Sequence, residues 1–117
     1  MLAVDDDLQA LRFIRRALEE GGYQVTVTND PSLCAKLVQD EQPDLVLLDL
    51  RFPDVTGLDL LHRIRESSSV PVIFLTGSDP ADSSGRAIEA GATDYITKPF
   101  SPPELLARIE VALRRGR

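Results

Sequence analysis

The sequence has little of the chemistry that many enzymes and secreted proteins use: its 117 residues include one cysteine, one histidine and no tryptophan. A single cysteine excludes an internal disulfide and is typical of a reducing cytoplasm. Cys34 stands among apolar residues, so we interpret it as a small core residue, and we expect His62 on the surface. No apolar run is long enough to cross a membrane and no signal peptide is visible, which predicts a cytoplasmic protein without membrane contacts.

Positive charge is also scarce. The chain has 13 Lys and Arg against 19 Asp and Glu, and its net charge of −6 argues against direct binding of nucleic acid through phosphates. Its 43% hydrophobic and 27% charged residues are typical of a globular protein. Because the chain has no repeat, low-complexity segment or internal linker, we expect one domain over residues 1–117.

Five strand-like segments alternate with helix-like segments. The strands are expected at residues 1–4, 23–28, 45–48, 70–75 and 94–97, and helices at Leu8–Glu20, after Asp30, from Leu58, over the polar residues 79–90 and after Ser101. The unbroken apolar run at 45–48 indicates a central strand that is buried on both faces. This alternation predicts an α/β fold, in which a parallel sheet is wound with helices on both sides.

Polar side chains stand where four of these strands end. Asp5 and Asp6 follow the first strand, Asp49 follows the third, Thr76 the fourth and Lys98 the fifth. The carboxyl ends of parallel strands meet at one edge of a doubly wound sheet, so we expect these side chains to lie together. Three carboxylates repel one another unless cations neutralise them. One lysine is not enough, and an oxygen-only ligand set without histidine or cysteine favours Mg²⁺ over zinc.

A carboxylate, a hard metal ion, a lysine and a hydroxyl are the parts that phosphoryl transfer requires. Placement assigns the roles: Asp49 attacks phosphorus. Asp5 and Asp6 hold the metal ion, while Thr76 and Lys98 bind phosphoryl oxygens. Each residue alone is more often a helix cap or a solvated side chain. Their occurrence at successive strand ends favours the functional interpretation.

Four motifs carry a resemblance to a known family. The chain contains "VDDD", "PDLVLLDLRFPDVTG", "VPVIFLTG" and "GATDYITKPFSPPELLARI". With these motifs it resembles, over essentially its whole length, the receiver domain of bacterial two-component response regulators. The resemblance implies a flavodoxin-like (βα)₅ fold with a five-stranded parallel sheet. It also implies phosphorylation of Asp49 by a sensor histidine kinase or a phosphotransfer protein. Such a receiver is not an enzyme with a separate substrate; it is a phosphoacceptor that catalyses its own phosphorylation and dephosphorylation.

The resemblance refines the role of each site residue. It implies that Asp6, Asp49 and the carbonyl of Arg51 ligate Mg²⁺ directly, and that Asp5 acts through a water molecule. It implies that Tyr95 is the aromatic switch residue, which turns inward as Thr76 moves toward the phosphoryl group. It also implies a cis peptide bond between residues 98 and 99.

The output of the domain is a further expectation from the resemblance. The last motif is most similar to receivers of winged-helix transcriptional regulators, which form phosphorylation-dependent homodimers through the fourth helix, fifth strand and fifth helix. The positions that match their interface ion pairs are Asp94, Glu104, Arg108 and Arg115. An effector domain that controls transcription would then lie outside this chain. The alternative is a stand-alone receiver, or the receiver module of a hybrid kinase, that acts through protein–protein contact.

Other classes fit less well. A haloacid-dehalogenase-like phosphatase places a second aspartate two residues after its nucleophile, where this chain has Arg51. A flavin carrier needs a first loop that cradles phosphate, and Asp5, Asp6 and Asp7 would repel phosphate. A degenerate receiver would lack the acceptor or the lysine, and both are present.

Overall fold

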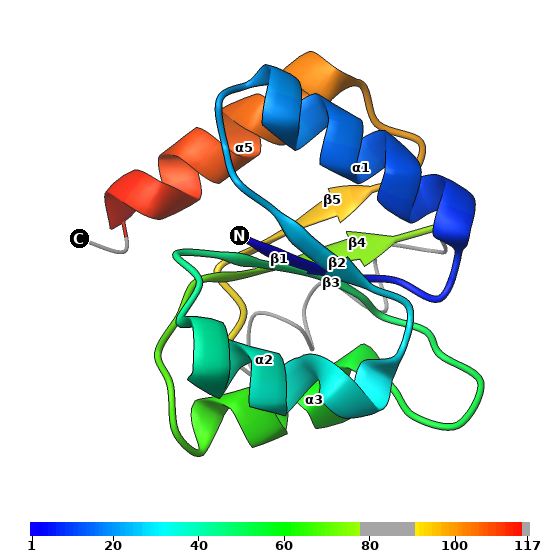
Figure 1. The fold of residues 1–117 in the computed structure, drawn as a ribbon, viewed down its shortest axis with the longest axis vertical. Helices are drawn as coiled ribbons and strands as arrows, with labels where there is room; N and C mark the ends of the chain where they lie inside the picture. The colour runs from blue at the N-terminus through cyan, green and yellow to red at the C-terminus, as the bar shows by residue number, and fades with distance from the viewer. Residues whose placement is uncertain (78–90, 116–117) are drawn as a thin grey trace.

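The computed structural model describes residues 1–77 and 91–115, in which five strands form one parallel sheet (Figure 1). The strands are β1 (Leu2–Val4), β2 (Thr26–Thr28), β3 (Val46–Asp49), β4 (Val72–Thr76) and β5 (Asp94–Thr97). The helices are α1 (Leu8–Glu20), the 3₁₀ helix η1 (Pro31–Leu33), α2 (Cys34–Glu41), α3 (Gly57–Arg65) and α5 (Pro102–Arg115). The helix predicted over residues 79–90 lies outside the described residues.

The strand order is β2-β1-β3-β4-β5, so the chain reverses its winding direction between β1 and β3. Helices α1 and α5 cover one face of the sheet, and α2 and α3 cover the other (Figure 1). The central strands β1, β3 and β4 are buried along their whole length, as their apolar sequences predict. The predicted flavodoxin-like, doubly wound parallel sheet is confirmed.

Helix boundaries follow the capping residues. Asp7 begins α1 by accepting a hydrogen bond from the amide of Gln9, at 2.9 Å. Thr56 begins α3 with a reciprocal capping box, in which its side chain accepts from the Asp59 amide and the Asp59 carboxylate accepts from the Thr56 amide. The Asp30 cap predicted for the second helical segment is present too, although the segment opens with the 3₁₀ turn η1.

Some local predictions were wrong. The second strand begins at Thr26 rather than Tyr23, because the parallel pairing with β1 starts where Thr26 lies opposite Leu2. The helical spacing of the apolar residues also predicts that Leu8 and Leu33 face the core, but they are 56% and 42% exposed. Leu8 is the first residue of α1 and Leu33 belongs to the 3₁₀ turn η1 that precedes α2, so both stand near the start of their helical segments, where the apolar pattern overstates burial. Within the described residues, no helix is both long and apolar enough to cross a membrane.

Candidate functional site at the carboxyl edge of the sheet

The site forms where β1 and β3 end side by side. Val4 pairs with Leu48 in the parallel ladder, so the residues that follow them, Asp5 and Asp49, are neighbours across the sheet. This is also the point at which the chain changes its winding direction. Ligand sites of open α/β sheets form in the crevice at such a point. The sheet topology therefore brings together carboxylates that are more than forty residues apart in the sequence.

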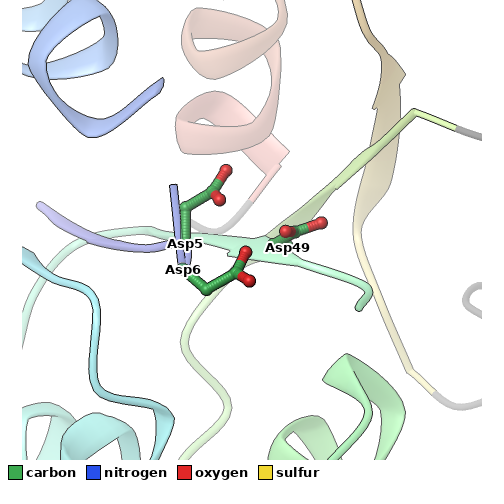
Figure 2. Close-up of side chains that lie close together, drawn as sticks. All are labelled: Asp5, Asp6 and Asp49. Atoms are coloured by element: carbon green, nitrogen blue, oxygen red, sulfur yellow. The ribbon is translucent and has the colours of Figure 1, made fainter. Parts of the chain in front are cut away.

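Three carboxylates converge at this edge (Figure 2). Asp5, Asp6 and Asp49 each offer one oxygen, and these oxygens lie within 4.8 Å of one another. Asp5 is fully buried and Asp49 is 8% exposed, whereas Asp6 is exposed. The sequence-based prediction that these side chains lie together agrees with this geometry.

Asp5 and Asp6 differ in how much of their carboxylate is already used. The two oxygens of Asp5 accept hydrogen bonds from the Asp7 amide at 3.0 Å and from Lys98 Nζ at 2.9 Å. Within residues 1–77 and 91–115, the carboxylate of Asp6 accepts no hydrogen bond from the protein. Asp6 therefore has both oxygens available for a ligand, and Asp5 has few lone pairs left.

Lys98 brings the one ammonium group of the cluster. The Lys98–Pro99 peptide bond is cis, as the family resemblance implied. The ammonium nitrogen lies 2.9 Å from Asp5 Oδ2 and 3.9 Å from Asp49 Oδ2. Burial disfavours the charged form of Lys98, but the hydrogen bond that its ammonium donates to Asp5 and the negative charges of Asp49, Asp5 and Asp7 outweigh burial and raise the pKa of Lys98. The lysine is therefore fully charged at neutral pH.

The environment of Asp49 raises the pKa of its carboxyl from 3.8 to about 6. Burial is the largest cause, and the negative charge of Asp5 adds to it. The ammonium of Lys98 and the amide of Arg51, which donates to Asp49 Oδ1 at 3.4 Å, act in the opposite direction. Asp49 is thus mostly ionised at neutral pH, but its negative charge destabilises the folded protein.

Thr76 and Tyr95 lie on the neighbouring strands β4 and β5. Thr76 is the last residue of β4 and is 1% exposed; the residue before it, Leu75, pairs with Asp49. Tyr95 of β5 pairs with Phe74 of β4, and its partly buried side chain packs on the face of the sheet that α2 and α3 cover. Side chains alternate between faces along a strand, so Thr76 belongs to the same face as Tyr95.

The oxygen-only cluster fits a hard divalent cation. Two or three carboxylate oxygens with room for water suit Mg²⁺, and no histidine or cysteine belongs to the cluster within the described residues. Within the described residues the Asp6 carboxylate accepts no hydrogen bond, whereas Asp49 Oδ1 accepts one from the Arg51 amide.

The predicted interface residues divide into two kinds. Arg108 Nη1 of α5 donates to both carboxylate oxygens of Asp94 in the same chain, at 3.1 and 3.3 Å. Glu104 and Arg115 are exposed on α5 and form no ion pair with any described residue. The structure therefore brings one predicted pair together within a single chain.

Sequence reasoning missed the part that Asp7 plays. Its amide donates to Asp5, its carboxylate caps α1, and its charge helps to raise the pKa of Lys98. The run of three aspartates was the available signal, but it does not show which of them turns toward the helix. By contrast, the interpretation of Cys34 as a core residue is confirmed, since it is fully buried and burial raises its thiol pKa to about 11. His62 is exposed, as expected.

Comparison with known proteins agrees with this arrangement. The sequence profile of the response regulator receiver domain matches residues 1–110. The chain is 39% identical over 116 residues to the transcriptional regulatory protein KdpE of Mycobacterium tuberculosis, covering 99% of this chain and 51% of that protein. It is 38% identical over 118 residues to the phosphate regulon transcriptional regulatory protein PhoB of Pseudomonas aeruginosa, covering 98% and 52%. The chain thus spans about half the length of these curated relatives.

Solved structures give the same assignment. A CheY-like response regulator receiver domain from Methanospirillum hungatei superposes with a TM-score of 0.90 at 31% identity, covering 98% of this chain and 93% of that one. The receiver domain of the Francisella response regulator 1452 superposes with a TM-score of 0.90 at 32% identity, covering 99% and 97%. The predicted relationship to transcriptional regulators is also confirmed. The chain belongs to the response regulator receiver domain family.

Proposed function

We propose that this domain accepts a phosphoryl group on Asp49 from a phosphohistidine of a sensor kinase or phosphotransfer protein, in a reaction that requires Mg²⁺. The observation that carries the proposal is the convergence of Asp5, Asp6 and Asp49 with the ammonium of Lys98. A structural role alone does not account for it, because two of the carboxylates are buried close together and destabilise each other's charge.

The proposed reaction is an in-line displacement at phosphorus. A carboxylate oxygen of Asp49 forms the new P–O bond, the P–N bond to the donor histidine breaks, and the imidazole leaves with the electron pair and takes up a proton. A raised carboxyl pKa supports this role, because a less stabilised carboxylate is a better nucleophile at neutral pH. Hydrolysis of the acyl phosphate by water returns Asp49 to its free form, so the domain catalyses both its loading and its unloading.

The other residues position and neutralise the phosphoryl group. Mg²⁺, when bound, neutralises charge on the transferring phosphoryl oxygens. Asp6, Asp49 and the carbonyl of Arg51 would hold it, while Asp5, which already bonds to Lys98, acts through water. We assign to Lys98 and Thr76 the binding of the remaining phosphoryl oxygens.

For the output, we propose that Thr76 and Tyr95 respond to phosphorylation and change the face that includes β5 and α5. Their position on one face of neighbouring strands supports this coupling. The relatives named as transcriptional regulators are about twice as long as this chain, which supports control of transcription by a further part of a longer protein. A homodimer formed through this face is part of the proposal. Its alternative is a receiver that acts by contact with another protein.

The assignment of Asp49 as the acceptor is tested by substituting an aspartate near each end of β3, Asp49 at its carboxyl end and Asp44 before its amino end. Incubation with acetyl phosphate and Mg²⁺ should add one phosphoryl group to the wild-type chain, as measured by intact-mass spectrometry. Asp49→Asn should abolish the addition. Asp44→Asn, which changes an exposed aspartate just before the amino end of β3, should leave it unchanged. Phosphorylation that persists in Asp49→Asn would place the acceptor elsewhere and overturn the proposal.

A further inference from the structure

We propose that Gly57 is a positioning residue for the acceptor: its missing side chain lets the start of α3 lie directly against the backbone of Asp49 and Leu50, and this contact sets the geometry of the phosphoryl site. The inference rests on the proposed function for its meaning. Gly57 is not a metal ligand and would not contact the phosphoryl group.

The contact leaves no room for a β-carbon. A Cβ built on Gly57 would overlap the carbonyl oxygen of Asp49, and it would lie 2.9 Å from Leu50 Cα and 2.8 Å from Phe74 Cε1. Gly57 does not have a positive φ, unlike Gly22 and Gly91. Glycine is therefore required here by the close approach of two backbones, not by an unusual backbone conformation.

The two backbones are held in place on both sides of the contact. The Gly57 amide donates to the Leu50 carbonyl at 2.8 Å, and the Leu50 amide donates to the Leu75 carbonyl of β4 at 3.2 Å. A Phe74 ring could rotate or shift, but the Asp49 carbonyl belongs to a strand paired on both sides. A β-carbon would therefore move the start of α3 away from the end of β3.

That displacement would reach the site through the loop between the two elements. Residues 51–56 form a loop whose two ends are joined by the hydrogen bond between Gly57 and Leu50. An isolated β-bridge between Arg51 and Thr56 joins the first and last residues of this loop. The Arg51 amide donates to the Asp49 carboxylate, and its carbonyl belongs to the proposed ligand set. At 3.4 Å this hydrogen bond is already long, so a shift of a few tenths of an ångström would break it. Metal binding and in-line attack both depend on this placement.

A second glycine provides a matched control. Gly77 follows the last residue of β4 at the same edge of the sheet, but a Cβ there would have Lys98 Cδ as its nearest neighbour, at 3.9 Å. Gly77→Ala therefore adds the same methyl group beside the same site without forcing any backbone to move. A general effect of replacing glycine near the site would appear in both variants.

The test compares Gly57→Ala and Gly77→Ala with the wild-type chain. Mg²⁺ affinity is measured by calorimetric titration, folding by circular dichroism, and the phosphorylation rate with acetyl phosphate at saturating Mg²⁺. In Gly57→Ala we expect Mg²⁺ affinity and phosphorylation rate each to fall by about tenfold or more, and in Gly77→Ala both to stay within about twofold. A folded Gly57→Ala protein with wild-type Mg²⁺ affinity overturns the inference. If the wild-type chain itself is not phosphorylated, the proposed function fails instead, and the Mg²⁺ titrations still test the positioning role.

If Gly57→Ala does not fold, the double variant Gly57→Ala/Phe74→Leu decides the question. It removes the overlap with the aromatic ring and keeps the overlap with the Asp49 carbonyl. Recovered folding with weakened Mg²⁺ binding supports the positioning role. Recovered folding together with wild-type Mg²⁺ affinity overturns it, because the ring contact would then be the whole effect. Failure of the double variant to fold also overturns it, because Gly57 would then be a requirement of the fold alone.

Discussion

Among the described residues, two partly buried cations, one at each edge of the sheet, contact different kinds of acceptor. At the amino edge, Arg65 at the end of α3 donates to the carbonyls of Ser68, Val70 and Gly91, at 3.4, 2.7 and 2.9 Å. These neutral acceptors come from the α3–β4 connection and from the residues before β5. At the carboxyl edge, Lys98 lies among ionised carboxylates.

The difference shows what separates a structural contact from a reactive one. Burial lowers the pKa of Arg65, and no carboxylate among the described residues forms an ion pair with it, but three backbone carbonyls accept hydrogen bonds from its guanidinium. Lys98 faces Asp5 and Asp49 with Asp6 close by, so one ammonium serves three carboxylates. The amino edge needs nothing further, whereas the carboxyl edge still needs positive charge.

The largest expected effect separates the two cations by their dependence on pH. Arg65→Met should lower the free energy of unfolding by about 2–4 kcal/mol at both pH 5 and pH 8, because carbonyls do not titrate. Lys98→Met should cost about 1–2 kcal/mol at pH 8 and less at pH 5, where Asp49 is largely protonated and no longer needs the ammonium. Urea unfolding with a chelator present measures both. Equal losses at both pH values would show that the edges do not differ in this way.

The site at the carboxyl edge could be predicted from the sequence, whereas the contacts at the amino edge could not. Asp5, Asp6, Asp49, Thr76 and Lys98 were predictable as a cluster, because the period of the apolar runs locates each strand end and parallel strands end at one edge. The carbonyl contacts of Arg65 were not predictable, since an arginine after an apolar helix position has the pattern of a solvated side chain.

Other features depended on tertiary neighbours that no local pattern encodes. The close contact between the backbones of Gly57 and Asp49, which leaves no room for a β-carbon, could be recognised only from the packing of α3 against β3. The late start of β2 depends on its register with β1, and the exposure of Leu8 and Leu33 depends on where each helix crosses the sheet. Sequence periodicity indicates which side of an element is apolar, but not where along the element the core ends.

The next effect concerns which carboxylate the metal ion contacts. Asp6→Ala should weaken Mg²⁺ binding by about tenfold or more, and should change stability little, because this side chain is exposed and its oxygens are free. Asp5→Ala should weaken Mg²⁺ binding less but should lower stability, because it removes the acceptor of the Asp7 amide and of Lys98. Calorimetric titration and thermal unfolding give the two quantities. A stronger loss of Mg²⁺ affinity in Asp5→Ala would exchange the two roles.

A smaller effect follows from the raised pKa of Asp49. The fold favours the protonated carboxyl of Asp49, so the contribution of this one group to the stability of the metal-free wild type is full below pH 3.8 and is lost as the pH rises through about 6. Asp49→Asn is neutral throughout. With a chelator it should therefore exceed the wild type by about 1 kcal/mol at pH 8, and the gain should shrink as the pH falls toward 4.

Two controls accompany this measurement. Asp44→Asn, an exposed change just before the amino end of the same strand, should show no such pH-dependent gain. Saturating Mg²⁺ should stabilise the wild type and reduce the advantage of Asp49→Asn, because ligands stabilise the state that binds them. An advantage that stays constant between pH 4 and pH 8 would mean that the carboxylate charge is not its source.

The smallest expected effect concerns an ion pair that is more exposed to solvent than the cations at either edge of the sheet. Asp94 begins β5, and its partner Arg108 on α5 has a side chain that is 48% exposed, so water screens their attraction. A double-mutant cycle on the monomer should give a coupling of about 0.5 kcal/mol that declines in high salt. A homodimer that used these side chains would exchange the pair within each subunit for two equivalent pairs between the subunits, at little net cost. Sedimentation should then show a monomer without beryllofluoride, a dimer with it, and a weaker dimer in Arg108→Ala. Arg114→Ala, which breaks an exposed pair with Glu110 on another side of α5, should dimerise like the wild type. A monomer under both conditions would favour the receiver that acts alone.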